Sequence, residues 1–266
     1  METRKIVIGA VVVLIGLPVV LVLIAAAWIH VLDRTNGAIV SSGRPRSYLL
    51  YVPPRYDRAK PTPLVISMHG AAEWPAQQMN LSRWNRLAES QGFIVVYPTR
   101  IHANGVSNGG GMAFVLSCTL SDRIAAVGMV AAAQSLPWSW CTDRRPVPMI
   151  AFHGTADPIA PYSGGRSPVP PGDLFPNVPT WTANWARRNR CGLNPVDSVV
   201  AMDVTRREYT HCADHAAVVL YTIRGGGHSW PGGKPLPEWM VGPTSRSVDA
   251  TSQMWAFFRA HPLQRN

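Results

Sequence analysis

Short apolar runs alternate with amphipathic or small-residue stretches over most of the chain. Apolar runs bounded by proline, glycine or polar clusters are typical of buried strands, and the longer stretches between them predict helices. Strands and helices that alternate in this way form a mostly parallel sheet flanked by helices. The sequence therefore predicts an α/β fold. The predicted strands are residues 47–52, 64–68, 93–97, 101–106, 124–131, 147–153 and 216–223, and the predicted helices are residues 84–91, 109–119 and 248–260.

The amino terminus carries a long apolar run. Residues 6–29 have no charge, and Arg4 and Lys5 precede them. As a helix this run would reach about 36 Å, enough to cross a bilayer with some tilt. It is longer than the apolar core of a cleaved signal, although residues 25–27 supply the small side chains that signal cleavage needs. We expect an uncleaved membrane anchor, keep a cleaved signal as the alternative, and expect the rest of the chain to be exported in either case.

The remaining residues suffice for one domain. The chain has 266 residues, of which 47% are hydrophobic and 15% charged, and this balance excludes disorder and a second large domain. We expect an anchor or signal segment at residues 1–30, a polar linker at 31–46 and one folded domain at 47–266. The formal net charge is +10 without a long block of basic residues. We interpret it as a basic surface attracted to anionic envelopes or membranes, and we do not expect nucleic acid as a partner.

Four cysteines support export, because an even set is typical of proteins that fold in an oxidising compartment. They lack the short spacings of zinc ligands, so we expect neither a metal ion nor a cofactor. Three pairings are possible, and we favour the sequential ones, with buried free thiols as the alternative. The favoured pairs are Cys118 with Cys141 and Cys191 with Cys212.

A G-x-S-x-G motif at residues 105–109 places Ser107 between a predicted strand and a predicted helix. This context is that of a nucleophile elbow, in which a tight turn exposes a serine hydroxyl at the carboxyl edge of a sheet. Gly105 and Gly109 lack Cβ atoms and would allow the strand and the helix to pack closely. Ser107 is therefore the candidate nucleophile, and a glycine-rich turn without a catalytic role is the alternative.

A serine nucleophile needs a base and a residue that orients the base. Asp157 follows a predicted buried strand, and His228 follows the last strand after three glycines, on a loop that we expect to be flexible. The chain order Ser, Asp, His is that of such hydrolases. The rival acids have no strand directly before them, His153 is expected to be structural, and the histidines beside Cys212 are expected at the surface. These other residues are Asp143, Asp173, Asp214, His211 and His215.

The oxyanion hole of such a site uses two backbone N–H groups. Their positions predict Asn108, directly after the nucleophile, and Ala71, after His69 and Gly70. The helix that begins near Gly109 adds its positive amino-terminal end.

Four motifs together resemble a known family. They are His69-Gly70, Gly105-Val106-Ser107-Asn108-Gly109-Gly110, His153-Gly154-Thr155-Ala156-Asp157-Pro158-Ile159 with Pro161-Tyr162, and Gly226-Gly227-His228-Ser229-Trp230-Pro231-Gly232-Gly233. Over residues 46–262 the chain resembles the secreted polyhydroxybutyrate depolymerase and feruloyl esterase family. The resemblance implies an α/β-hydrolase fold, and it supports a cysteine pair at positions 191 and 212. It also implies ester hydrolysis through an acyl-enzyme, with hydroxyalkanoate polyesters, hydroxycinnamoyl esters or acetylated polysaccharide as substrates.

The chain departs from this family before the nucleophile strand. The family places about twice as many residues between the positions of His69 and Ser107, including a helix between two strands. Here residues 98–100 alone separate the predicted strands 93–97 and 101–106. Because parallel neighbours need a crossover of a dozen or more residues, both strands cannot occupy their usual places. We expect the first strand to be displaced or reversed, or a hole to remain where the helix would cover the sheet. We expect the protein to keep its triad but to be destabilised, and to be weakly active or inactive.

The interpretation that fits these motifs best is an extracytoplasmic serine esterase with Ser107, Asp157 and His228 as its triad. Its substrate would be an ester, polymeric or small. The alternative is a membrane-tethered, catalytically impaired relative that binds polymer or envelope surface. A peptidase or lipase would differ only in its pocket, which the irregular loop 158–179 could shape. Trp181 and Trp185 follow this loop, and for at least one of them we favour a place in the core.

Overall fold

The computed structural model describes residues 33–41, 43–70, 73–98, 104–133, 136–170 and 172–263, together with Val20, Ala27 and Val31. The predicted anchor or signal segment therefore lies outside the described residues, except at two positions. Within the described part of the chain, no helix combines the length and hydrophobicity needed to span a membrane.

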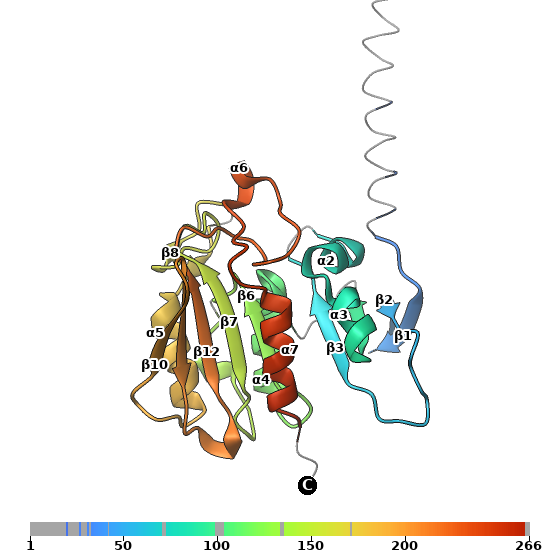
Figure 1. The fold of residues 1–266 in the computed structure, drawn as a ribbon, viewed down its shortest axis with the longest axis horizontal. Helices are drawn as coiled ribbons and strands as arrows, with labels where there is room; N and C mark the ends of the chain where they lie inside the picture. The colour runs from blue at the N-terminus through green and yellow to red at the C-terminus, as the bar shows by residue number, and fades with distance from the viewer. Residues whose placement is uncertain are drawn as a thin grey trace, which may run out of the picture.

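One sheet of ten strands organises the fold (Figure 1). Its order is β1-β2-β4-β3-β5-β6-β7-β12-β11-β10. The six strands from β4 to β12 in this order are parallel, and antiparallel pairs extend the sheet at both ends. The strands are β1 (Gly37–Ser41), β2 (Arg44–Tyr51), β3 (Leu64–Met68), β4 (Ile94–Pro98), β5 (Asn104–Val106), β6 (Val127–Val130), β7 (Met149–Gly154), β10 (Val196–Ala201), β11 (Val204–Tyr209) and β12 (Val218–Ile223).

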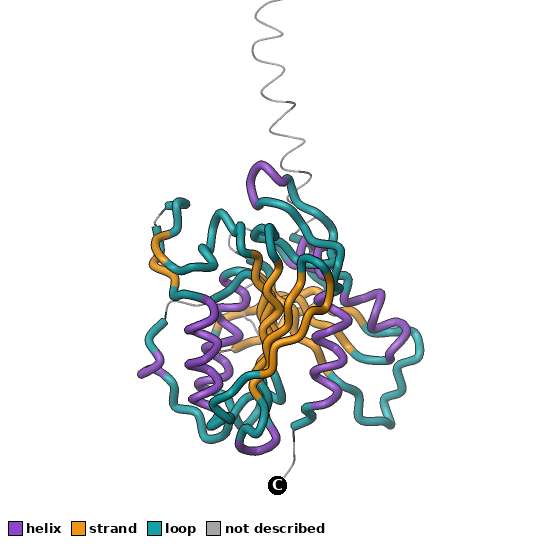
Figure 2. The backbone as a smooth tube through the Cα atoms, turned by 60° about the vertical axis from the view of Figure 1, so that its left-hand side comes forward, coloured by secondary structure: helices purple, strands orange, loops and turns teal. Residues whose placement is uncertain are grey.

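Helices cover both faces of the sheet (Figure 2). Alternate residues of β7 enter two different buried clusters, as the two-residue period of a strand requires. Ile150 and Phe152 join the cluster that contains α3 and α7 side chains, whereas Met149 and Ala151 join the one with α4 and α5. The helices are α2 (Pro75–Ser82), α3 (Trp84–Gln91), α4 (Asn108–Thr119), α5 (Val178–Arg188), α6 (Glu238–Val241) and α7 (Ala250–Ala260), and a small hairpin pairs β8 (Gly165–Arg166) with β9 (Leu174–Phe175).

The predicted α/β fold is confirmed, and the sheet also contains strands that the pattern did not reveal. Residues 37–41 and 44–46, which the sequence analysis assigned to a linker, belong to β1 and β2. They pair along a hairpin at the edge of the sheet. The hairpin was missed because β1 is short and its apolar side chains Ile39 and Val40 are exposed, so it does not show the pattern of a buried strand.

Of the two alternatives expected before the nucleophile strand, the displacement or reversal of the first strand is wrong, and a hole where the helix would cover the sheet stays a prediction. Both strands are parallel to β3 and lie on opposite sides of it, so β4 is neither displaced nor reversed. In the described part of the chain, β5 comprises Asn104–Val106 and begins beside the carboxyl half of β3, where Asn104 pairs with Ser67. The chain from Pro98 need not return along a strand; it must only cross two strand spacings, roughly 10 Å, within a reach of roughly 20 Å.

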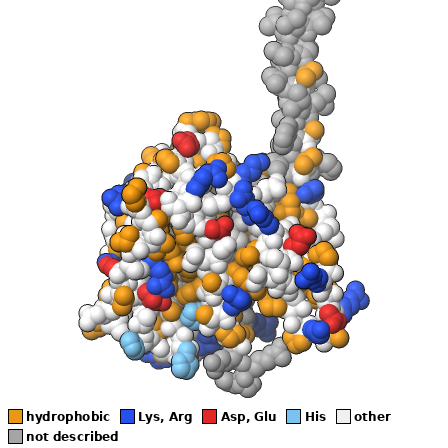
Figure 3. All heavy atoms as spheres, in the orientation of Figure 1, with side chains coloured by type: hydrophobic (Ala, Val, Ile, Leu, Met, Phe, Trp, Pro, Cys, Tyr) orange, Lys and Arg blue, Asp and Glu red, His pale blue; other side chains and the backbone are white. Residues whose placement is uncertain are grey.

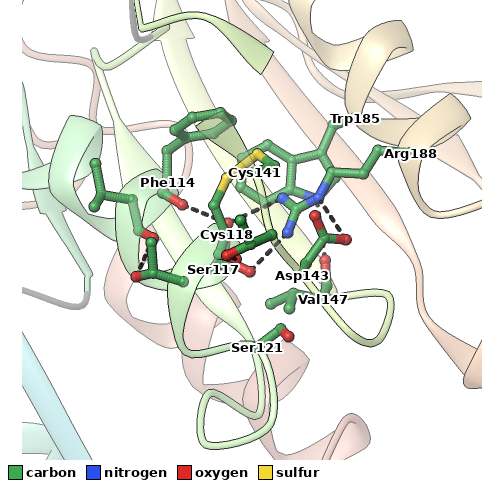
Figure 4. Close-up of a disulfide and its surroundings, with 12 residues drawn as sticks. Phe114, Ser117, Cys118, Ser121, Cys141, Asp143, Val147, Trp185 and Arg188 are labelled. Atoms are coloured by element: carbon green, nitrogen blue, oxygen red, sulfur yellow. Dashed lines mark hydrogen bonds and ion pairs between the residues drawn. A yellow bond between two sulfur atoms is a disulfide. The ribbon is translucent and has the colours of Figure 1, made fainter. Parts of the chain in front are cut away.

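Both disulfides have the predicted sequential pairing, Cys118–Cys141 and Cys191–Cys212. The first joins the last turn of α4 to the segment after β6. Beside it, Arg188 pairs with Asp143 at 3.2 Å, donates to the Ser117 carbonyl at 2.7 Å and lies over the Trp185 ring (Figure 4). Arg188, the last residue of α5, therefore connects α5 to α4 and to the segment that the disulfide joins to α4.

Basic side chains are spread over the surface among hydrophobic and acidic ones on the face drawn in Figure 3.

Candidate active site

Ser107 occupies the turn between β5 and α4. Its φ of 55° and ψ of −125° are strained for a residue with a side chain, and such strain is typical of a nucleophile elbow. The turn is held because the Ser107 N–H donates to the Val130 carbonyl at 2.9 Å, and the Gly111 N–H donates to the Ser107 carbonyl at 3.0 Å. The half-buried serine thus lies at the carboxyl edge of the sheet and at the amino terminus of a helix.

The two glycines of the motif are required by close packing. A Cβ at Gly105 would lie 2.6 Å from the Met68 carbonyl oxygen and 3.1 Å from the Gly109 carbonyl carbon. A Cβ at Gly109 would lie 2.9 Å from the carbonyl oxygens of Met68 and His69. Strand, helix and the end of β3 therefore approach one another more closely than any larger residue permits.

Asp157 and His228 form a buried pair. Asp157 follows β7, His228 follows β12, and these strands are parallel neighbours. The imidazole Nδ1 lies 2.9 Å from Asp157 Oδ2 and 3.1 Å from Oδ1, so it donates to the carboxylate. The N–H groups of Ile159 and Ala160 donate to Oδ1 at 2.8 Å each. Burial alone would raise the pKa of Asp157, but hydrogen bonds from His153 and His228 outweigh it and hold this pKa well below its usual range.

The loop that carries His228 is packed rather than flexible. The His228 N–H donates to the Val241 carbonyl at 2.6 Å, and the Gly227 N–H donates to the Pro243 carbonyl at 2.8 Å. A Cβ at Gly227 would lie 2.1 Å from the Val241 oxygen, and a Cβ at Gly154 would lie 2.0 Å from the oxygen of Gly226. The glycines therefore serve close contact between this loop and its neighbours, which corrects the expectation of a mobile loop.

His153 contributes to the site in a way that sequence reasoning missed. Its Nε2 donates to the Ala160 carbonyl at 2.8 Å and lies 3.4 Å from Asp157 Oδ2. His153 is the penultimate residue of β7, four residues before Asp157, and its ring helps to hold the carboxylate. The sequence feature that could have indicated this contact is a histidine and an aspartate on either side of the end of one buried strand.

The serine and the Asp157–His228 pair lie at the same, carboxyl edge of the sheet. They follow β5, β7 and β12, with β6 between the first two, and every one of these strands is parallel to its neighbour. Among the described residues, no hydrogen bond joins Ser107 to His228, and the pair with Asp157 is the part of the predicted triad that is connected.

Of the two predicted oxyanion donors, only one belongs to a residue that the structure describes. Asn108 is the first residue of α4, where backbone N–H groups have no partner within the helix. Ala71 lies outside the described residues. The neighbouring Gly70 N–H donates to Glu73 Oε2 at 2.7 Å, and a side chain at Gly70 would lie between Glu73 and the Cβ of Ser107. Glu73 is thus a further acidic group near the nucleophile. Burial raises its pKa, against the hydrogen bond from Gly70.

A cavity of about 400 Å³ opens beside Ser107, which is one of its lining residues. Asp173 and Phe175 of the β8–β9 region line it, so part of the loop 158–179 shapes this cavity. Trp181 and Trp185 do not, because both are buried in the core. The remaining lining residues include Ser107, Asn108, Met112, Val115 and Leu136.

Curated relatives of this chain are esterases, although no protein-family model matches it. Feruloyl esterase B of Piromyces equi is 34% identical over 155 residues, which cover 56% of this chain and 28% of that protein. Feruloyl esterase C of Emericella nidulans is 24% identical, with 85% of this chain and 87% of that protein covered. The chain spans between 22% and 51% of the length of three of the curated relatives that it matches.

A solved structure agrees with the fold. The acetyl xylan esterase from Aspergillus awamori superimposes with a TM-score of 0.55 at 14% identity, covering 81% of this chain and 94% of that one. The parallel sheet, the helices on both its faces and the agreement with this structure show that the chain has an α/β-hydrolase fold, and the curated relatives that it resembles are esterases.

Proposed function

We propose that the protein is a serine esterase that cleaves carboxylic esters through an acyl-enzyme. The observation that carries the proposal is the buried Asp157–His228 pair at the same sheet edge as the strained Ser107 turn. Hydrolases of this type need a nucleophile, a base and a carboxylate that orients the base, in this chain order. The similarity to feruloyl esterases supports the same reaction class.

In this proposal Ser107 attacks the ester carbonyl carbon while His228 Nε2 accepts the hydroxyl proton. The same proton then passes to the leaving alcohol, and water hydrolyses the acyl-enzyme with His228 again as base. Asp157 stays ionised because its pKa is lowered, so it can stabilise the imidazolium. The hydrogen bond between Ser107 and His228 forms when substrate binds, since such contacts are often loose in the free enzyme.

The developing oxyanion would accept hydrogen bonds from the backbone N–H groups of Asn108 and Ala71. The amino-terminal end of α4, which starts at Asn108, adds a favourable partial positive charge there. Substrates in this proposal are polyhydroxyalkanoate-type polyesters, feruloyl esters or acetyl esters, and the cavity beside Ser107 would receive one side of the scissile ester.

We also propose an extracytoplasmic location. Two disulfides favour an oxidising compartment. Membrane attachment through residues 6–29 stays a prediction, and fractionation of the full chain and of residues 31–266 would test it. Recovery of both forms in the soluble fraction would contradict an anchor.

A fluorophosphonate probe tests the central assignment. It should label the wild-type protein and fail to label Ser107→Ala, while Ser90→Ala, at an exposed position on α3, should be labelled as wild type. Hydrolysis of p-nitrophenyl esters of increasing acyl length would then define the substrate range. Labelling that survives Ser107→Ala would remove Ser107 from its proposed role.

The alternative is a catalytically impaired relative that binds polymer. The shortness of β5 favours it, because the nucleophile strand has few ladder contacts. This alternative would be supported if the folded wild-type protein bound polymer but neither reacted with the probe nor hydrolysed any ester.

A further inference from the structure

A second cavity lies at the β10–β12 end of the sheet, on the left in Figure 1, and shares no lining residue with the cavity beside Ser107. Its volume is about 410 Å³, which is within the range of small-molecule sites. Side chains on one face of β10, β11 and β12 form its floor, and we call it the sheet-face pocket. These side chains are Asp197, Val199, Thr205, Arg207, Leu220 and Thr222.

The floor of the sheet-face pocket consists of two neighbouring rows of residues that run across the three strands. The pairing register places Asp197, Arg207 and Leu220 in one row and Val199, Thr205 and Thr222 in the other. Directly paired residues share a face, and every second residue of a strand returns to it, so all six side chains lie on the same face. The floor is therefore held by the pairing of the strands rather than by a loop.

An ion pair on the floor balances its charge. Arg207 donates from Nε to Asp197 Oδ1 at 2.8 Å and from Nη2 to Oδ2 at 2.7 Å. A guanidinium has five N–H donors and a carboxylate has several acceptor positions, so both partners keep hydrogen-bonding capacity for a ligand. The other four floor side chains are uncharged. A ligand without net charge fits this balance better than an ion does.

Hydroxyl and apolar groups surround the ion pair. Thr205 is exposed, and the Tyr162 hydroxyl lies 2.8 Å from Thr222 Oγ1, where either group can be the donor. Each hydroxyl both donates and accepts hydrogen bonds, so these groups match a ligand whose polar groups do the same. Val199, which is 79% exposed, and Pro179 at the start of α5 add apolar contacts.

We propose that the sheet-face pocket binds the sugar units of a neutral carbohydrate chain. A sugar ring combines hydroxyl groups, which donate and accept hydrogen bonds, with apolar C–H groups, and it carries no charge. A peptide strand would instead pair its main chain with the edge of a sheet, whereas this pocket lies on the face of the strands. The binding site is separate from Ser107, and the proposal goes beyond ester hydrolysis.

The sheet-face pocket shares a wall with the candidate active site. The Tyr162 ring meets the His153 ring edge-on, with ring centroids 5.9 Å apart. His153 also pairs with Thr222 in the sheet, and its Nε2 lies 3.4 Å from Asp157 Oδ2. An esterified carbohydrate chain held here would have a raised local concentration beside the triad. This consequence rests on the proposed esterase activity, whereas the binding itself does not.

Isothermal titration calorimetry of the full chain tests the proposal. The ligands are xylohexaose, cellohexaose and mannohexaose, which are neutral and contain no ester. At least one of them should bind saturably. Hexagalacturonate, which is anionic, and a neutral glycine–serine peptide amide are the comparison ligands, and neither should show saturable binding.

Two arginine variants locate the site. Arg207→Met should weaken binding about tenfold or more, because hydrogen bonds from a charged group are stronger than those between neutral groups. Arg206→Met is the matched control, since Arg206 lies on the opposite face of β11 and its loss also breaks an ion pair, with Glu208. It should bind as wild type. Thr205→Val keeps the shape of the side chain but removes the hydroxyl, and it should also weaken binding. Circular dichroism should show that all three variants are folded.

Saturable binding that Arg207→Met and Thr205→Val weaken and Arg206→Met does not would support the proposal. It is overturned if no neutral oligosaccharide binds, if Arg207→Met binds as wild type, or if both arginine variants are weakened equally. Binding of the anionic sugar or of the peptide as tightly as the neutral sugars would assign the pocket to another class of ligand and would also overturn it. Hydrolysis of p-nitrophenyl acetate is measured separately, so inactivity with intact binding would contradict the proposed esterase alone.

Discussion

The two halves of the candidate site rest on unequal parts of the sheet. The half that holds Asp157 and His228 follows β7 and β12, which pair in register from Met149 to Gly154 and from Val218 to Ile223. The half that holds Ser107 follows β5, a strand of three residues. The base and its carboxylate are therefore positioned by long ladders, whereas the nucleophile depends on a short ladder, the helix α4 and close packing through glycine.

This difference shows that a chain can contain the three groups of a triad without holding all three equally rigidly. Motifs in the sequence record which groups are available for chemistry, but the length of the strand below each group determines how firmly that group is held. Four experiments can test whether the two halves differ in the way the structure indicates.

The largest expected effect comes from the well-supported half. Asp157→Asn should lower kcat for p-nitrophenyl acetate by about 10⁴-fold, because the amide cannot hold the imidazole in the required tautomer or stabilise its charge. Circular dichroism should show that the variant stays folded. As a control, Asp143→Asn changes a carboxylate that pairs with Arg188 away from Asp157 and should retain turnover. Turnover of Asp157→Asn within tenfold of wild type would contradict the proposed role.

A smaller effect concerns the support of the nucleophile. Gly105→Ala should destabilise the protein by about 3 kcal/mol, since the new Cβ meets the backbone of β3 at 2.6 Å. Gly192→Ala is the matched control, because its Cβ would meet the nearest atom at 3.4 Å. Urea unfolding measures both variants. Equal stabilities for the two would show that the β3–β5 contact tolerates expansion.

The pH dependence of stability probes the buried carboxylate. The pKa of Asp157 is lowered on folding from its ordinary value of 3.8, so its ionised form stabilises the fold above about pH 4. That contribution, about 2 kcal/mol for a paired carboxylate, is lost as pH falls toward the lower folded-state pKa. The stability difference between wild type and Asp157→Asn should therefore shrink in acid. A difference that grows as pH falls below 4 would reverse the sign of the assigned shift.

The smallest expected effect is a difference in local opening. Backbone amides of β3 and β5 should exchange with deuterium at least tenfold faster than those of β7 and β12, which corresponds to a free energy of protection about 1.4 kcal/mol lower. The reason is that, among the described residues, β5 pairs with each of its two neighbours at only two positions. Mass spectrometry of peptic fragments gives both sets in one experiment. Uniform protection across the four strands would show that the short strand does not weaken its half of the sheet.

Elements that proline, glycine or polar residues clearly delimit were predictable from the sequence. Leu64–Met68 and Trp84–Gln91 have the predicted ends, and the helix stops where Gly92 adopts a φ of 73°. By contrast, β10 has exposed residues along nearly its whole length, so it lacks the buried pattern from which strands were recognised. Helix α2 was also missed, because it buries polar side chains such as Gln78 and Ser82 beside apolar ones such as Leu81 and therefore has no clear apolar face.

The candidate site was predictable where chain order and position carry the information. The Asp157–His228 contact follows from two residues that end neighbouring strands. The contact of His153 with Asp157, and that of Glu73 with the Gly70 N–H, depend on how side chains turn after the strands have assembled. A pattern along one chain does not contain that orientation, so these residues emerged only from the structure.

The glycine-packed loop around His228 limits how this protein can change. Any side chain larger than hydrogen at Gly154 or Gly227 would meet backbone within about 2 Å, so these positions are closed to variation that keeps the base in place. The β8–β9 hairpin has no such constraint, because Leu174 is exposed and its neighbour Phe175 lines the cavity beside Ser107. Divergence in substrate choice should therefore accumulate in the hairpin, while the residues that carry the base stay fixed.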